Sequence, residues 1–299
     1  MSYKKDKIFN FIRYLISIFL IIYLIKIPDW GVLFLDEINL YTHIFFFIIL
    51  TLLQFSMFSI RWTILLKIYK RIENKKINFF ENFKIYIKSS LLNIILPGAL
   101  GGDIYRLQKS IRNYNIRLKE SSLIILIERF LGLISLLIYF YFGLLFLKAP
   151  IFLNNLNLYI FMIIFLSGFS IYILIYLFDK KHKLRFKNYF KVFLISFIAQ
   201  GFNLIASTII LKAFLPSSKL FWPLIIFPAS YLASLIPISI GGLGVRESVI
   251  SLIINELGSN LNIGIIISLL VYLLRIITGI IAVSFIYIFE IMKRRVKFI

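Results

Sequence analysis

Charged side chains inside long apolar stretches are the residues of this sequence best placed to do chemistry. Glu128 and Arg129 lie within the apolar run from Leu123 to Leu147, and Arg275 lies deep in the last apolar segment. Charge at membrane depth is costly and usually lines a ligand path or pairs with another charge. Neighbouring helical residues diverge by about 100°, so we expect Glu128 to meet a basic group from a hairpin and Arg129 to face a cavity or head group. The alternative is that these charges pair for structural reasons only, and Arg61, near a span end, can simply extend to the interface.

Two further arginines follow a motif that occurs twice. The first copy reads Ser90-Leu-Leu-Asn-Ile-Ile-Leu-Pro97-Gly-Ala-Leu-Gly101-Gly102-Asp-Ile-Tyr-Arg106, and the second reads Ser230-Tyr-Leu-Ala-Ser-Leu-Ile-Pro237-Ile-Ser-Ile-Gly241-Gly242-Leu-Gly-Val-Arg246. Ser, Pro, both Gly and Arg recur at a constant offset of 140 residues. The next helix carries an arginine near a glycine in each half, Arg129 with Gly132 and Arg275 with Gly279. We interpret this pattern as an internal repeat.

Each motif has the chemistry of a helical hairpin tip that binds an anion. Proline ends the inbound limb because it removes a donor and clashes with the preceding turn, and the glycine pair permits positive φ and close backbone approach. The return limb then begins a helix whose free N–H groups favour an anion. Arg106 and Arg246 are expected in its first turn, where a guanidinium binds phosphate through paired donors. Alternatively, they only neutralise Asp103 or Glu247 and anchor the limb.

The candidate site residues follow from these arguments. Those expected to bind a lipid head group are Arg106, Arg129, Arg246 and Arg275, with Glu128 and Glu247 as their charge partners. The hairpin tips are expected at Pro97, Gly101, Gly102, Asp103, Pro237, Gly241, Gly242 and Gly244.

The elements that must position these residues are membrane-spanning helices. Of 299 residues, 61% are hydrophobic and 16% charged, whereas about a quarter of a soluble domain is charged. Crossing a bilayer takes ~20 helical residues, and six stretches qualify: roughly 8–27, 42–65, 121–147, 158–178, 192–214 and 263–291. Trp30, Trp62 and Trp222 lie near span ends, as interfacial aromatics do. The sequence predicts an all-α polytopic membrane protein.

Basic residues indicate the orientation of these spans. The net charge is +21, and the dense Lys and Arg clusters precede the first span and follow the second, fourth and sixth. The loops around 28–41, 154–157 and 255–262 have no Lys or Arg. The positive-inside rule therefore predicts a multi-pass protein of the cytoplasmic membrane with both termini in the cytoplasm. This assigns the charge to topology, and no nucleic-acid partner is expected.

Two apolar stretches do not fit as ordinary spans. The run 89–102 is too short to cross and has basic residues on both sides, and 220–245 is interrupted by three prolines and three glycines. We predict re-entrant hairpins at about 85–113 and 222–257, which enter from opposite sides. The chain 1–299 is then one membrane domain with a first repeat, 1–149, and an inverted second repeat, 150–299. Such inverted repeats with broken helices are a recurrent transporter design.

Several function classes lack support in the sequence. Cysteine is absent, and His43 and His182 are far apart, so no metal site is expected. Asp103, Glu128 and Glu247 are potential acid–base groups, but no activated nucleophile accompanies them. The segment from Gly241 to Gly244 lacks the preceding strand of a dinucleotide fingerprint. We therefore expect no cofactor and no catalytic set.

Three ordered motifs carry a resemblance to a known family. Leu96-Pro-Gly-Ala-Leu-Gly-Gly-Asp103 with Arg106, Ile127-Glu-Arg-Phe-Leu-Gly132, and Pro237-Ile-Ser-Ile-Gly-Gly-Leu-Gly-Val-Arg-Glu247 resemble the lysylphosphatidylglycerol synthase transmembrane-region family, the flippase-like domain of multiple-peptide-resistance proteins. Arg61-Trp62 also fits, and the resemblance covers about residues 8–291. It implies a domain that moves or accommodates anionic or modified lipids. We do not expect this chain to contain the soluble aminoacyl-tRNA-dependent domain of the synthases, so the resemblance argues against lysyl transfer.

The resulting expectation is a flippase-like carrier, not an enzyme, for an anionic or modified lipid: a phospholipid, an aminoacyl-phospholipid or a polyprenyl-phosphate-linked lipid. Its partners would be membrane lipids and a separate lipid-modifying transferase. Three alternatives stay open: a membrane enzyme with Glu128 or Asp103 as base, a scaffold for a transferase, and a carrier of small solutes.

Overall fold

The computed structural model describes Lys26 and residues 40–69, 77–95, 101–146, 186–235 and 242–296. Within these ranges the ordered elements are all helices, with no β-strand. They are α2 (Leu40–Tyr69), α3 (Phe79–Ile95), α4 (Gly101–Tyr114), α5 (Leu118–Phe146), α7 (Phe186–Phe214), α8 (Trp222–Ala233), α9 (Val245–Glu256) and α10 (Leu261–Val296). The predicted all-α class is confirmed for the described part of the chain.

Four of these helices are long and apolar enough to cross a membrane: α2, α5, α7 and α10. They correspond to four of the six predicted spans, and the other two, 8–27 and 158–178, lie outside the described residues. The four helices begin before the predicted spans, and α2 and α10 also run past them, because a helix continues through its polar end turns after leaving the apolar zone. Large apolar side chains are exposed along them, such as Phe45 at 60% and Phe285 at 70%. Lipid contact accounts for this exposure, and the protein is a multi-pass membrane protein.

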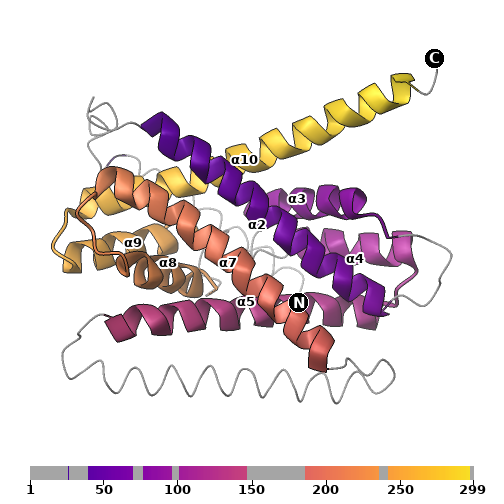
Figure 1. The fold of residues 1–299 in the computed structure, drawn as a ribbon, viewed down its shortest axis with the longest axis horizontal. Coiled ribbons are helices and arrows are strands. Elements are labelled where there is room, and N and C mark those ends of the chain that lie inside the picture. The colour runs from indigo at the N-terminus through magenta and orange to yellow at the C-terminus, as the bar shows by residue number, and fades with distance from the viewer. Residues whose placement is uncertain are drawn as a thin grey trace, which may run out of the picture.

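Two pairs of short helices lie between the long ones and come from opposite ends of the molecule (Figure 1). In the first pair, Glu81 of α3 accepts a hydrogen bond from Asn113 of α4, which places the outer ends of these antiparallel helices together. In the second, α8 and α9 pack against each other at the end where α10 begins. The helices α3, α4, α8 and α9 are not among the helices long enough to cross a membrane.

The breaks between the paired helices fall at the predicted tips. α3 ends six residues before Gly101, and α8 ends at Ala233, well before Gly242. Gly242 and Gly244 have φ of 76° and 84°, as expected of glycines that reverse the chain. Gly101 and Gly102 are instead the first residues of α4, so the prediction of positive φ there is wrong. Pro97, Pro237 and Gly241 lie outside the described residues.

Two apolar clusters hold the helices together. One joins α2, α7, α8, α9 and α10 around Phe47, Ile210 and Phe227, all fully buried. The other joins α2, α3, α4 and α5 around Trp62 and Leu131. Trp62 is 1% exposed, so its predicted interfacial position is wrong: it packs inward against the α3–α4 pair. The first cluster thus supports one helix pair and the second cluster the other.

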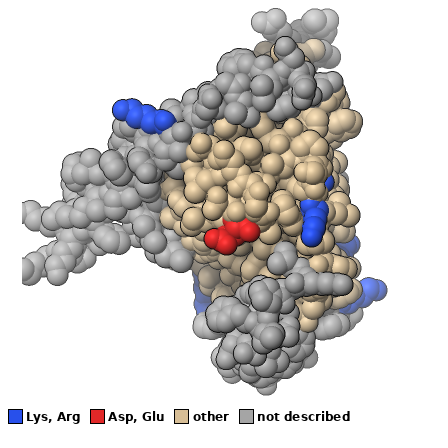
Figure 2. All heavy atoms as spheres, turned by 90° about the vertical axis from the view of Figure 1, so that its left-hand side faces the viewer, with Lys and Arg blue, Asp and Glu red and all other residues tan. Residues whose placement is uncertain are grey.

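The two ends of the molecule differ in charge. Exposed basic residues gather where α2 and α4 end and where α5 and α7 begin: Lys67, Arg112, Arg117, Lys119, Lys187 and Lys191. At the opposite end, at the left of Figure 1, the described residues on the face shown in Figure 2 are mostly uncharged, with isolated charged groups. This asymmetry agrees with the predicted distribution of basic residues along the chain.

A buried hydrogen-bond chain anchors the α3–α4 pair to α2. The Tyr114 hydroxyl donates to Asn82 Oδ1 at 2.6 Å, and Asn82 Nδ2 donates to Thr63 Oγ1 at 2.9 Å. Asn82 is fully buried. Burial, with Glu81 nearby, raises the pKa of Tyr114, so its hydroxyl keeps its proton in the folded protein.

Replacing Tyr114 with phenylalanine is expected to lower the free energy of unfolding by about 1–3 kcal/mol, because Asn82 Oδ1 then lacks a donor. Since the folded-state pKa is raised, this stabilisation is present below about pH 10 and is lost as the pH rises further. Thermal unfolding in detergent micelles at neutral and strongly alkaline pH measures both effects. Tyr41→Phe, at a position 87% exposed, is the control. Equal stability of the two variants at neutral pH would contradict the prediction.

Candidate functional site

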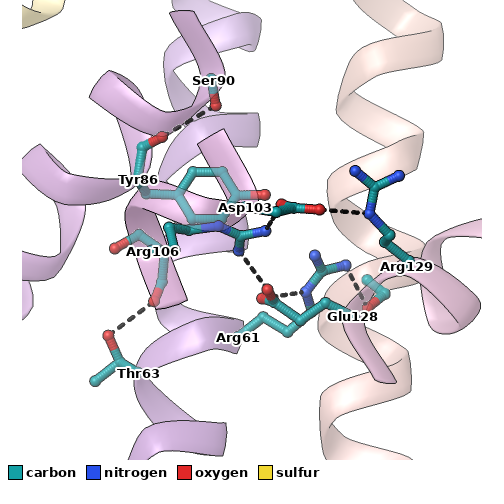
Figure 3. A network of polar contacts seen from close by, with 10 residues as sticks. Arg61, Thr63, Tyr86, Ser90, Asp103, Arg106, Glu128 and Arg129 are labelled. Carbon is teal, nitrogen blue, oxygen red and sulfur yellow. Dashed lines mark hydrogen bonds and ion pairs between the residues drawn. The ribbon is translucent and has the colours of Figure 1, made fainter. Parts of the chain in front are cut away.

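Five charged side chains meet at one place, contributed by three helices: Arg61 of α2, Asp103 and Arg106 of α4, and Glu128 and Arg129 of α5 (Figure 3). Glu128 is the centre of this cluster, with 1% of its residue surface exposed. Its Oε1 accepts from Arg61 Nε at 3.1 Å, and its Oε2 accepts from Arg106 Nη1. The expectation that Glu128 meets a basic group from a hairpin is confirmed, because Arg106 belongs to the α3–α4 pair.

Asp103 links the remaining two arginines. Its Oδ1 accepts from Arg106 Nη2 at 2.6 Å, and its Oδ2 accepts from Arg129 Nε at 2.5 Å (Figure 3). Every carboxylate oxygen of the cluster therefore accepts a hydrogen bond from a guanidinium. Removing such charges from water costs free energy. Their mutual attraction offsets this cost only when the geometry is good and further hydrogen bonds are made. The cluster can exist at this depth because each carboxylate lies between two cations.

Aromatic rings and a serine hold the two buried arginines in place. The Arg106 guanidinium carbon lies 4.9 Å from the centroid of Tyr86 and 5.9 Å from that of Trp62. Arg61 lies 4.7 Å from the centroid of Phe58, and its Nη1 donates to Ser196 Oγ of α7 at 3.0 Å. Such cation–π contacts strengthen as water is excluded. The cluster is thereby fixed to α3 and α7 as well as to its own helices α2, α4 and α5.

A close helix crossing determines where Asp103 and Arg106 lie. A Cβ built on Gly102 would be 1.9 Å from the Ser89 carbonyl oxygen, so α4 passes α3 at a distance only glycine permits. The Gly102 N–H donates to Asn93 Oδ1 at 2.8 Å. One of the free N–H groups at the start of α4 therefore already has a partner, and Asp103 occupies the first turn, where an anion was predicted. Arg106 lies in the second turn, not in the first as predicted.

A cavity of about 450 Å³ opens beside the cluster, within the size range of ligand pockets. All five charged residues line it, together with Asn93 of α3 and Gln200 of α7. Its apolar lining includes Leu126 and Leu235, which are 47% and 54% exposed. The Arg129 side chain is 38% exposed, whereas those of Arg61 and Arg106 are each 5% exposed. The mouth of the cavity thus has apolar walls and one accessible guanidinium, that of Arg129. Arg129 was predicted to face a cavity or a head group.

The other two predicted arginines form a second cluster in the second half. Arg275 lies at the centre of the span Leu261–Phe289, and its Nη2 donates to Asn203 Oδ1 and to the Tyr231 hydroxyl, the latter at 3.0 Å. Arg246 lies in the first turn of α9, as predicted, 3.8 Å from Glu247 Oε1. The structure thus brings Arg106 and Arg129 into one cluster, and Arg246 and Arg275 into another.

Several residues of these clusters were not predicted. Extension to the interface was one interpretation of Arg61, but Arg61 is 4% exposed and pairs with Glu128, which agrees with the alternative that these charges pair with one another. Its place in the apolar segment before Trp62 was an available signal. The polar residues Ser196, Gln200, Asn203 and Tyr231 were also missed, although Ser196, Gln200 and Asn203 repeat at the spacing of one face of a helix. Within the described residues, no group of three or more His, Asp or Glu side chains is placed to hold a metal ion.

Comparison with protein-family models gives one match, to the lysylphosphatidylglycerol synthase transmembrane region, over residues 10–282. The chain belongs to this family. The match includes both helix pairs and both arginine clusters, and it confirms the resemblance drawn from the motifs. No curated protein matches the chain. Family membership and the apolar helices together make this a polytopic membrane protein of a lipid-related family.

Proposed function

We propose that this chain is a flippase-like protein that binds the head group of an anionic or modified lipid and moves it across the cytoplasmic membrane. The observation that carries the proposal is the cavity beside the charge cluster. Its walls contain three guanidiniums and two carboxylates, which leaves one positive charge in excess among the described lining residues. An anionic head group would neutralise this charge, while acyl chains stay in the lipid beyond the apolar mouth.

The proposed topology has six crossings and two re-entrant hairpins in an inverted repeat, with both termini in the cytoplasm. Three observations support it. The α3–α4 and α8–α9 pairs come from opposite ends of the molecule. The gaps between the paired helices overlap at the 140-residue offset, and exposed basic residues gather at the end from which α3 and α4 enter. In transporters of this design, the substrate site lies at the broken elements, which is where the cavity is found.

The residues nearest the cavity favour binding over catalysis. Both carboxylates have their oxygens occupied by guanidiniums, and these contacts include no nucleophile from the described part of the chain. A general base must lie within hydrogen-bond reach of the proton that it removes. We therefore assign this chain a transport role, and any chemical modification of the lipid to a separate transferase.

Replacing Arg129 with glutamine tests the proposal, because Arg129 carries the accessible guanidinium at the cavity mouth. In proteoliposomes with fluorescent phosphatidylglycerol, we expect the translocation rate of Arg129→Gln to fall at least about tenfold, as befits the loss of a charge-assisted phosphate contact. Reduction of the outer-leaflet fluorophore by dithionite measures the rate. Arg117→Gln, at an exposed position in the turn before α5, is the matched control and should leave the rate unchanged. If the wild type moves no lipid class faster than empty liposomes, the proposal is wrong.

A further inference from the structure

Both carboxylates among the described lining residues of the cavity are already paired with cations of the protein itself (Figure 3). The two oxygens of Glu128 accept from Arg61 and Arg106. Those of Asp103 accept from Arg106 and Arg129. A ligand ammonium that entered the cavity would therefore meet three guanidiniums and two carboxylates whose charge is already balanced. The charges of the cavity attract an anion and repel a cation.

The aromatic rings of the cavity are also engaged by cations of the protein. The Arg61 guanidinium carbon lies 4.7 Å from the centroid of Phe58, and that of Arg106 lies 4.9 Å from the centroid of Tyr86. A ring face attracts a cation, but a second cation at the same ring is repelled by the first. Phe130 is the third ring among the described lining residues, and a single ring attracts an ammonium less than an ionised carboxylate does. The described walls thus offer an ammonium no strong partner.

Two neutral amides complete the polar lining, those of Asn93 on α3 and Gln200 on α7. Asn93 Oδ1 accepts from the Gly102 N–H, and its Nδ2 is an uncharged donor for a ligand. Gln200 Nε2 lies 3.6 Å from the position of a Cβ built on Gly132. Gly132 follows Arg129 by three residues, so both lie on one face of α5. An amide that both donates and accepts is therefore one helical turn from the accessible guanidinium, which suits a hydroxyl group next to a phosphate.

We propose that the cavity selects phospholipids whose head group carries hydroxyls and no charge beyond the phosphate, and that it excludes head groups with an ammonium, aminoacylated lipids included. The phosphate would meet Arg129, and the hydroxyls would meet the amides of Asn93 and Gln200. A cavity of about 450 Å³ is within the range that holds drug-sized ligands, so the exclusion is one of charge and not of size. That the ligand is a lipid rests on the proposed function, whereas the preference among lipids rests on the charges of the cavity.

Lipid binding to the purified full chain tests this selectivity without relying on transport. Delipidated protein is mixed at about pH 6 with phosphatidylglycerol, its alanyl ester or its lysyl ester, which add one and two protonated amines to the same lipid. Native mass spectrometry measures the bound fraction, and the binding that Arg129→Gln loses is binding at the cavity. Because like charges placed together are strongly unfavourable, we expect phosphatidylglycerol to bind at least about tenfold more tightly than the alanyl ester, and the lysyl ester to bind most weakly. Equal or tighter binding of either ester, or no binding that depends on Arg129, would overturn the proposal.

A carboxylate placed in the cavity is expected to change the selectivity. Gln200 is half-buried, and Gln200→Glu adds a negative charge that cancels the excess positive charge of the described lining. Arg129 nearby favours the ionised form of the new side chain. The preference for phosphatidylglycerol over the lysyl ester should then fall at least about tenfold. Gln200→Leu removes the amide without adding charge, so this control should bind phosphatidylglycerol more weakly and still exclude both esters.

Thermal unfolding in lipid-free micelles shows whether the two Gln200 variants are folded, and the wild-type comparison decides the proposal if they are not. A folded Gln200→Glu protein with the wild-type preference would mean that charge does not set the selectivity. Transport distinguishes this inference from the proposed function. Equal translocation of all three lipids would overturn the selectivity and leave the transport role intact. Selective binding without translocation of any lipid would overturn the transport role and leave the selectivity intact.

Discussion

Replacing Glu128 with glutamine is expected to lower the free energy of unfolding by about 3–5 kcal/mol, the range seen when one partner of a buried ion pair is removed. The glutamine keeps the shape of the side chain but presents an amide N–H to a guanidinium. Arg61 or Arg106 then faces a donor where it had a carboxylate oxygen, with 5% of each side chain exposed. Chemical unfolding in mixed micelles measures the loss.

The same substitution is expected to reduce lipid translocation at least about tenfold, because it displaces the side chains that position the cavity arginine, and misplacements of about 1 Å are known to be costly where reacting groups must be positioned. Arg106 holds Asp103, and Asp103 holds Arg129, so the loss of Glu128 reaches the cavity mouth through two hydrogen bonds. Transport is compared in proteoliposomes at a temperature where both proteins are folded.

A matched control and a rescue make the Glu128 prediction specific. Glu256→Gln removes the same charge at an exposed position at the end of α9 and should change neither property. Adding Arg61→Met to Glu128→Gln removes both partners and should recover part of the stability, since replacing both members of a pair is often nearly neutral. Equal stability of Glu128→Gln and the wild type would mean that the cluster contributes nothing to folding. An additive double variant would mean that Arg61 and Glu128 are not coupled.

Replacing Gly102 with alanine is expected to destabilise the protein by about 3 kcal/mol, at the upper end of the usual cost of overpacking. The new Cβ would lie 1.9 Å from the Ser89 carbonyl oxygen and 2.6 Å from its carbon, and these are backbone atoms that cannot rotate away. α4 must therefore move from α3, which breaks the hydrogen bond from Gly102 to Asn93 and displaces Asp103. We expect translocation to be lost together with the stability.

Gly132→Ala is the matched control for the stability effect of Gly102→Ala. Both glycines are helical, but a Cβ on Gly132 would lie 3.6 Å from Gln200 Nε2, which is an ordinary contact. Alanine is the better helix former by about 1 kcal/mol, so Gly132→Ala should be as stable as the wild type or more stable. The unfolding temperatures of the two variants in the same detergent provide the comparison. If Gly102→Ala is as stable as Gly132→Ala, the close crossing of α3 and α4 is not a constraint on the fold.

The two halves of the chain use their repeated arginine differently. In the first half, Arg106 pairs with Asp103 and Glu128 and anchors the α3–α4 pair. This agrees with the alternative to phosphate binding given in the sequence analysis. In the second half, Arg246 Nε and Nη2 are buried without a hydrogen-bond partner among the residues that the structure describes. The two motifs differ in chemistry because the positions 140 residues after Asp103 and Glu128 are Leu243 and Ser268, which carry no carboxylate.

Much of the fold was predictable because the membrane imposes simple rules. Apolar runs of spanning length predicted α2, α5, α7 and α10, since a helix in lipid must satisfy its own backbone. Proline and glycine pairs predicted the breaks between α3 and α4 and between α8 and α9. Of the two roles predicted for the first glycine pair, Gly102 has the close backbone approach but not the positive φ, and its sequence position does not distinguish the two. The backbone of Ser89 on α3 lies against Gly102, and this contact in the tertiary structure shows that the glycine serves close packing of α4 against α3.

The sequence by itself determined that charges lie at membrane depth, that two motifs recur 140 residues apart, and that Glu128 must find a basic partner elsewhere. It did so because burial in lipid makes an unpaired charge expensive, whichever residue provides the partner. The tertiary structure alone decided that the partners are Arg61 and Arg106, that Asp103 joins Arg129 to them, and that Arg246 Nε and Nη2 are buried without a hydrogen-bond partner among the described residues. Those outcomes depend on which faces of α2, α4 and α5 meet, and these faces are set by packing between residues far apart in the chain.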